Sequence, residues 1–175
     1  MTAGIHGDEL NGIEIVRHFF EHVSPKHLSG TLLGVPVANL HGFRRGSRYL
    51  PDRRDLNRFF PGHPAGSSAS RIANALFDGV VRHCDALVDF HTGSFYRTNL
   101  PQLRANLRDD QVLGLAQAFG IGVNFSREGL VGPLRRAATD AGIPAITYEA
   151  GEPKRFQDEE IRRGVEGMRN LLCKM

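Results

Sequence analysis

Short apolar runs alternate with longer stretches of helical periodicity, and this alternation limits the folds open to the chain more than any other feature. The runs that predict strands cover residues 2–5, 31–38, 86–91, 121–125 and 143–149. Apolar residues at helical spacing predict helices over residues 8–23, 68–80, 109–119, 133–140 and 158–172. Strands that alternate with helices favour right-handed crossovers and a largely parallel sheet covered on both faces, so we expect an α/β fold.

Length and composition fit one globular domain. The chain has 175 residues, of which 41% are hydrophobic and 23% charged, so it can bury a core and disorder is not indicated. No apolar run approaches the roughly 18 residues that span a bilayer, and the N-terminus lacks the basic-then-apolar order of a secretory signal. We therefore expect a cytoplasmic protein without a membrane partner. Cys84 and Cys173 have no C-x-x-C spacing, so neither a disulfide framework nor a thiolate zinc cluster is indicated.

Three of the predicted strands end at a side chain that can take part in catalysis: His6, His91 and Glu149. Ligands of open α/β sheets bind outside the carboxyl ends of the strands, so these side chains should gather at one edge of the sheet. Glu9 follows His6 by three residues, in a segment whose glycines let the backbone turn sharply. Since a catalytic zinc usually takes three protein ligands and one water, His6, Glu9 and His91 predict a zinc site. Glu149 would stand beside it as a carboxylate that does not bind the metal.

Simpler interpretations exist for each of these residues. A histidine at a strand end is more often a hydrogen-bonded polar residue than a metal ligand, and Glu149 could cap a helix or pair with an arginine. Asp89 favours a site at His91, because it lies two residues earlier on the same strand face. His18 and His22 have the i, i+4 spacing of a zinc-binding helix but lack the accompanying acid, so we expect them at the surface.

An arginine-rich segment, residues 39–67, is long for a plain linker and therefore suggests a functional loop. Its arginines at the centre of the segment are Arg44, Arg45, Arg48, Arg53, Arg54 and Arg58. Guanidinium groups bind carboxylates through paired hydrogen bonds, which suits an anionic substrate. Arginine clusters also neutralise the phosphates of nucleic acids. Asp52 and Asp55 are interleaved here and the chain has few aromatic residues to stack bases, so we favour substrate binding over nucleic acid.

Four motifs occur in order along the chain, at residues 4–9, 47–62, 89–93 and 148–151. Their sequences are GIHGDE, SRYLPDRRDLNRFFPG, DFHTG and YEAG. Together they resemble the motifs of the succinylglutamate desuccinylase and aspartoacylase family, which belongs to the wider zinc carboxypeptidase superfamily. The resemblance covers nearly the whole chain. It implies a three-layer α/β/α fold with a mostly parallel, mixed central sheet, as in the zinc carboxypeptidases.

The resemblance also implies the roles of the metal-site residues. His6, Glu9 and His91 match the ligands of one zinc ion per chain, and Glu149 matches the glutamate that activates the metal-bound water. Asp55 matches the acid that orients the first histidine of the site, which fixes the tautomer of that histidine and raises its basicity.

The substrate-binding residues and the activity follow from the same resemblance. Asn57 and Arg58 match the pair that holds the substrate carboxylate. Arg48 resembles the arginine that stabilises the oxyanion, and Arg45 remains open as its substitute. We expect a zinc-dependent hydrolase that cleaves the amide bond of N-acyl amino acids or related small carboxylate-bearing amides. A zinc carboxypeptidase acting on peptides and a non-catalytic basic binding module are the alternatives, and a homo-oligomer is left open.

Family members normally extend beyond the matching region at both ends. Strands precede the first motif in these proteins, and a β-rich C-terminal region helps to close the substrate pocket. We therefore expect residues 1–175 to form a single zinc hydrolase catalytic domain that lacks these N-terminal strands and the C-terminal region.

Overall fold

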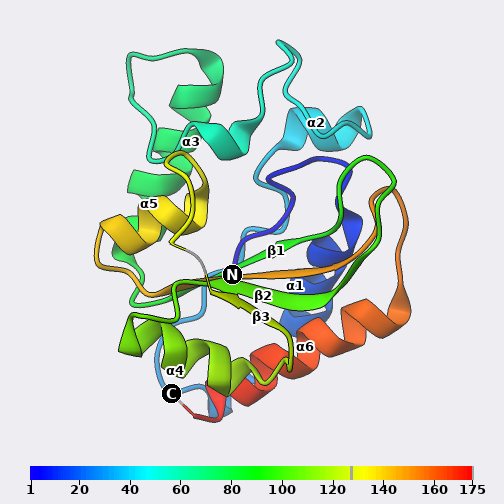
Figure 1. Cartoon of the computed structure of the whole chain (residues 1–175), viewed down its shortest axis with the longest axis vertical. Coiled ribbons are helices and arrows are strands. Elements are labelled where there is room, and N and C mark those ends of the chain that lie inside the picture. Colours follow the sequence, from blue (N-terminus) through cyan, green and yellow to red (C-terminus); the bar gives the residue numbers. More distant parts are fainter. Residues whose placement is uncertain (127, 175) are drawn as a thin grey trace.

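The computed structural model describes residues 1–126 and 128–174, and its centre is a mixed four-stranded sheet (Figure 1). The strands are β1 (Leu87–His91), β2 (Asn99–Ala105), β3 (Asn124–Ser126) and β4 (Ala145–Gly151), in the spatial order β1-β4-β2-β3. β1 and β4 are parallel, β2 and β3 are parallel, and the β4 to β2 pairing is antiparallel. The sheet therefore consists of two halves that run in opposite directions.

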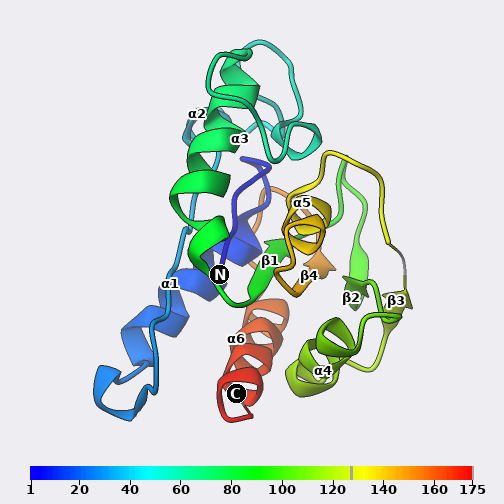
Figure 2. The same ribbon diagram turned by 90° about the vertical axis from the view of Figure 1, so that its left-hand side faces the viewer.

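Helices cover both faces of this sheet, which confirms the expected α/β/α layering (Figure 2). They are α1 (Leu10–His22), α2 (Leu40–Arg44), α3 (Ser68–Gly79), α4 (Asp110–Phe119), α5 (Leu134–Asp140) and α6 (Asp158–Leu172). One core cluster joins α1, α4 and α6 to the sheet, and a second joins α3 and α5 to the opposite face. No helix in the described ranges is both long and apolar enough to cross a membrane.

The strand alternation of β1 divides its side chains between these two faces. Val88 and Phe90 belong to the core cluster under α1, α4 and α6, whereas Leu87 belongs to the cluster under α3 and α5. Asp89 and His91 share the face of Leu87 but lie nearer the carboxyl end of the strand. β4 repeats the pattern, since its register sets Ala145 beside Leu87, Thr147 beside Asp89 and Glu149 beside His91. This face is thus apolar at one end and polar at the other, where the site lies.

The two predicted strands nearest the N-terminus are reduced to single bridges. Thr2 bridges to Asp89 on one side and to Val35 on the other, both in parallel orientation. Backbone hydrogen bonds join Val35 to Met1 and to Ala3. Beyond Pro36 the hydrogen bonds resume one residue out of ladder register, from the Ala38 amide to the Ala3 carbonyl oxygen and from the Asn39 amide to the Gly4 carbonyl oxygen. The prediction of strands over 2–5 and 31–38 was therefore wrong in extent.

β2 was absent from the sequence predictions. Its first half contains Pro101, and a bulge lies between Asn99 and Gln102, so apolar and polar residues do not alternate regularly along it. β3 was predicted over 121–125 and is observed as Asn124–Ser126, with exposed side chains along its whole length. Both differences concern the outer half of the sheet, which carries less buried apolar surface than β1 and β4.

Candidate active site

The turn between the N-terminal segment and α1 brings His6 and Glu9 together. Gly4 has a positive φ of 62°, a conformation that costs glycine little. Gly7 lies against the backbone of α2, where an added Cβ would be 2.0 Å from the carbonyl carbon of Gly42. The Glu9 amide donates to the His6 carbonyl oxygen at 3.2 Å, which closes the turn. The glycines therefore allow two ligand-type side chains to point the same way.

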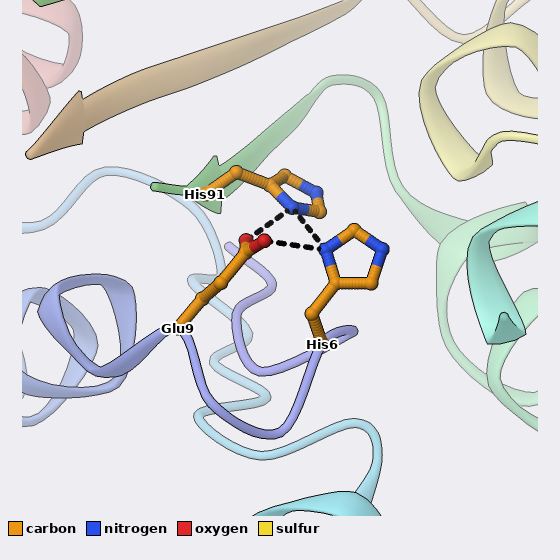
Figure 3. A group of neighbouring side chains, drawn as sticks. All are labelled: His6, Glu9 and His91. Atoms are coloured by element: carbon orange, nitrogen blue, oxygen red, sulfur yellow. Dashed lines mark hydrogen bonds and ion pairs between the residues drawn. The ribbon is translucent and has the colours of Figure 1, made fainter. Parts of the chain in front are cut away.

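Three buried side chains converge above the end of β1 (Figure 3). His6 Nδ1 lies 2.8 Å from Glu9 Oε1, His91 Nδ1 lies 2.8 Å from Glu9 Oε2, and the two Nδ1 atoms are 3.2 Å apart. Ligand atoms around a tetrahedral zinc with bonds of about 2.1 Å are about 3.4 Å apart. These separations would need to increase by about 0.2 to 0.6 Å to reach that value. Within the described ranges the cluster is the one group of this kind that could hold a metal ion.

The outer ring nitrogen of each histidine donates to a carboxylate. His6 Nε2 lies 3.1 Å from Asp55 Oδ1, and His91 Nε2 lies 2.8 Å from Asp89 Oδ2. Asp89 is itself held by the Thr2 hydroxyl, at 2.7 Å. Such partners orient an imidazole and leave its other nitrogen free for a metal. Asp55 was predicted in this position, whereas Asp89 was noted only as a neighbour of His91.

The charges of the cluster suit a bound cation. Burial alone would raise the pKa of Glu9, but His6 and His91 outweigh it and hold that pKa well below its usual range. Burial alone would also raise the pKa of Asp55, but His6 and Arg48 outweigh it and lower that pKa below its usual range. Both carboxylates are therefore ionised at neutral pH. Burial acts to lower the pKa of His91, yet Asp89 and Glu9 raise it well above its ordinary value, so the site without metal attracts positive charge.

Arg48 connects the cluster to its surroundings. Its guanidinium donates to Glu9 Oε1 at 3.2 Å, to Asp55 Oδ2 at 2.9 Å and to the Ser94 hydroxyl at 2.6 Å. Arg48 lines the pocket in front of the two histidines, and Arg45 is not among the described residues that do so. Of the two arginines left open by the sequence, Arg48 is therefore the one placed beside the cluster.

Glu149 lies at the end of β4, directly beside His91 in the parallel register. Asn99 donates to its Oε2 at 2.5 Å, and Arg104 pairs with its Oε1 at 2.9 Å. Burial raises the pKa of Glu149, and Glu9 adds to this rise, while His91 and Arg104 oppose it. Asn99 and Arg104 both come from β2, a strand that the sequence does not predict, so neither was expected beside Glu149.

Asn57 and Arg58 lie across the pocket, in a short 3-10 turn (Leu56–Arg58). The side-chain oxygen of Asn57 accepts from the Leu134 amide at the start of α5, at 2.8 Å. Its amide NH2 group is therefore the part left to bind a ligand. Arg58 is exposed, and its guanidinium donates to the Asn57 carbonyl oxygen at 2.9 Å.

One pocket of about 750 Å³ collects nearly all of the predicted site residues. It is lined by His6, Glu9, Arg48, Asn57, Arg58, His91 and Glu149, among others. Asp55 lies behind His6. The predicted surface residues His18 and His22 stack on each other on α1, with ring centroids 4.2 Å apart, and do not line this pocket.

Comparisons with known proteins find relatives of this chain. The family model described as Succinylglutamate desuccinylase/Aspartoacylase catalytic domain matches residues 1–175. N-alpha-acetyl-L-2,4-diaminobutyric acid deacetylase from Halomonas elongata is 32% identical over 126 residues, which are 69% of this chain and 37% of that protein.

Solved structures show the same fold. Succinylglutamate desuccinylase/aspartoacylase from Rhodobacter sphaeroides has a TM-score of 0.90 at 28% identity, covering 99% of this chain and 54% of that one. The product-bound ectoine utilization protein EutE (DoeB) from Ruegeria pomeroyi also has a TM-score of 0.90 at 28% identity, with coverages of 99% and 56%. The chain therefore spans about half the length of these solved relatives.

Proposed function

Because the chain belongs to the succinylglutamate desuccinylase/aspartoacylase catalytic domain family, we propose that it is a zinc-dependent hydrolase of small amides. Its substrates would be N-acyl amino acids or related amides that carry a carboxylate. We also infer that residues 1–175 form one zinc hydrolase catalytic domain. A single sheet carries both core clusters, and the family model covers the same residues, which supports this inference.

The observation that carries the proposal is the buried cluster of His6, Glu9 and His91 at the wall of the pocket. Both histidines turn Nδ1 toward the centre and donate Nε2–H to a carboxylate, as zinc-binding histidines do. One ion per chain would be held by these residues. A zinc ion bound there lowers the pKa of a water molecule and polarises the amide carbonyl.

Glu149 is proposed as the group that moves the proton. Its carboxylate accepts a proton from the attacking water as the new carbon–oxygen bond forms, and then delivers it to the nitrogen as the carbon–nitrogen bond breaks. The raised pKa of Glu149 makes the populations of its ionised and protonated forms less unequal at neutral pH. This suits a group that both accepts and donates a proton. Asn99 and Arg104 each engage one oxygen, and each oxygen keeps a second lone pair for the water.

Arg48, Asn57 and Arg58 are proposed to position the substrate. Arg48 is close enough to the metal cluster to stabilise the negative charge that develops on the carbonyl oxygen. The free NH2 group of Asn57 and the guanidinium of Arg58 would bind the substrate carboxylate through charge-assisted hydrogen bonds. The amide bond would then lie between this anchor and Glu149.

The test is hydrolysis of a panel of N-acetyl and N-succinyl amino acids by the zinc-supplemented protein. Release of the free amine is the measured signal. We expect turnover that a chelator abolishes and added zinc restores. C-terminally free dipeptides test the carboxypeptidase alternative, and salt-dependent binding of an oligonucleotide tests the basic binding module. The proposal would be contradicted if the protein cleaved peptides but not N-acyl amino acids. It would also be contradicted if the protein bound nucleic acid and hydrolysed none of these substrates.

A further inference from the structure

Two side-chain amides, those of Asn11 and Gln157, tie the loop between β4 and α6 to the start of α1. Asn11 is 1% exposed, and its Nδ2 donates to the Ala150 carbonyl oxygen at 3.3 Å and to Gln157 Oε1 at 3.1 Å. Asn11 Oδ1 accepts from the Gln157 amide at 2.9 Å. Gln157 Oε1 also accepts from the Glu152 amide, at 2.8 Å. The pair therefore holds both ends of this loop against α1.

The backbone at Gly151 is shaped for this contact. Its φ is +74°, and an added Cβ would lie 2.1 Å from Gln157 Oε1 and 2.7 Å from Asn11 Nδ2. A residue without a Cβ is needed both for this conformation and for this close approach. The Gly151 carbonyl oxygen accepts from the amide of Gly93, two residues after His91, at 2.9 Å. The amide pair is thus connected to the end of β1 as well as to the end of β4.

These contacts lie close in the chain to the groups that the proposed reaction uses. Asn11 follows Glu9, a proposed metal ligand, by two residues, and Ala150 follows Glu149 directly. In the part of the chain that the structure describes, no hydrogen bond joins the side chains of Glu9 and Glu149. Two carboxylates repel each other, and the charge of Glu9 acts on Glu149. The distance between them therefore has to be fixed by the backbone that carries them.

We propose that Asn11 and Gln157 are positioning residues, which hold Glu149 at the distance from the metal cluster that proton transfer needs. The inference rests on the proposed function, because it concerns the geometry of that reaction. Neither side chain is among the described residues that line the pocket, so both act through the backbone and not on the substrate. A displacement of about 1 Å caused by a distant mutation can cost about 100-fold in rate. Asn57 and Arg58, which are proposed to bind the substrate carboxylate, lie on another segment.

The Gln157→Met variant removes the acceptor but keeps the length of the side chain, at a position that is only partly buried. The probe is the N-acetyl or N-succinyl amino acid that the zinc-loaded wild type hydrolyses fastest. We expect kcat to fall about 10- to 100-fold, while KM and zinc affinity stay within about threefold of the wild type. A merely structural role would reduce the amount of folded, zinc-loaded protein without changing kcat per zinc-loaded chain.

The Gln157→Glu variant is the conservative rescue. It keeps an oxygen that can accept from Asn11 and from the Glu152 amide, so kcat should return to within about threefold of the wild type. The matched control is Gln111→Met, the same substitution in the exposed first turn of α4, which should keep the wild-type kcat. Circular dichroism verifies that each variant is folded.

The Asn11→Ala variant tests the other member of the pair and should show the same fall in kcat with unchanged KM. Combined with Gln157→Met, it should lower kcat no further than the more severe single variant, because both substitutions release the same loop. The inference would be overturned if Gln157→Met and Asn11→Ala kept the wild-type kcat, if Gln157→Glu were as slow as Gln157→Met, or if the two effects multiplied.

A binding experiment keeps the inference separate from the proposed activity. Acetohydroxamate binds zinc through two oxygens and gives its proton to a carboxylate beside the metal, so its affinity depends on where Glu149 lies. Azide binds zinc through one nitrogen and needs no such carboxylate. In calorimetric titration of the zinc-loaded proteins, Gln157→Met should bind acetohydroxamate about tenfold more weakly than the wild type. Gln157→Glu and Gln111→Met should match the wild type, and all of the proteins should bind azide equally.

The two kinds of failure are distinguishable. If the wild type hydrolyses no amide, the proposed function fails, while the acetohydroxamate titration still decides the role of the pair. Equal acetohydroxamate affinity of the wild type and Gln157→Met would refute the positioning role. A parallel loss of azide affinity in Gln157→Met would also refute it, because the metal cluster itself would then be disturbed.

Discussion

The carboxylates behind the two histidines should control metal affinity, and Asp55→Asn tests this with little disturbance of the fold. Asn57 N–H can still donate to the remaining side-chain oxygen, so the 3-10 turn is kept. The change removes the negative charge that orients His6 at 3.1 Å and that accepts from Arg48 at 2.9 Å. Loss of such a partner costs about 10- to 100-fold in metal affinity. Asp55 has a side-chain exposure of 15%, so solvent screens its charge in part and we expect the lower end, about tenfold or 1.4 kcal/mol.

Asp89→Asn should have a larger effect. Its bond to His91 is shorter, at 2.8 Å, and its side-chain exposure is 1%, so its charge is less screened. We expect a loss in zinc affinity of about 100-fold, or 2.7 kcal/mol. Asp52→Asn is the matched control, because Asp52 lies in the same segment as Asp55 but is exposed and contacts Arg54 and Ser68.

Competition with a chromophoric zinc chelator measures all of these affinities, and circular dichroism verifies that each variant is folded. The structure predicts the order Asp89→Asn, Asp55→Asn, Asp52→Asn, from the weakest zinc binding to the strongest. If Asp55→Asn and Asp89→Asn both bind zinc within twofold of Asp52→Asn, the argument that these carboxylates orient metal ligands is refuted.

Three further predictions concern Glu149. Glu149→Gln should keep its zinc but lose turnover by about a hundredfold or more, since an amide cannot accept the proton; unchanged kcat would remove Glu149 from the mechanism. The pH profile of kcat/KM should fall on the acid side as Glu149 becomes protonated, at a pH above the ordinary glutamate pKa of 4.5, because burial raises its pKa. Arg104 opposes that rise in the pKa, so Arg104→Met should move this acid limb to higher pH. A limb that stays in place would show that another group controls it.

The metal cluster could be predicted from the sequence because it follows from local order and strand direction. His91 and Glu149 each end a buried strand, and parallel strands end at the same edge, so their proximity needs no detailed structure. His6 and Glu9 are close in the chain. The arginine-rich segment by itself indicated only an anionic ligand, and the placement of Asp55 required the family resemblance.

The remaining features depend on tertiary structure. Asn99 and Arg104 reach Glu149 because β2 runs antiparallel to β4, with Gln102 opposite Glu149, and the proline and bulge in β2 conceal this strand from a periodicity argument. Arg135 and Arg136 are neighbours on a seven-residue helix. Their spacing does not show that Arg136 pairs with Asp140 and Glu128 while Arg135 is buried at the pocket.

The central claim is that His6, Glu9 and His91 form a zinc site, and the number of zinc ions bound per chain tests it most directly. After dialysis against zinc and removal of the excess, elemental analysis should find about one zinc per wild-type chain. The His91→Ala variant should retain almost no zinc. His22 is the last residue of α1, and the His22→Ala variant should retain the wild-type amount of zinc. A wild type that binds no zinc, or a His91→Ala variant that binds as much as the wild type, would contradict the account.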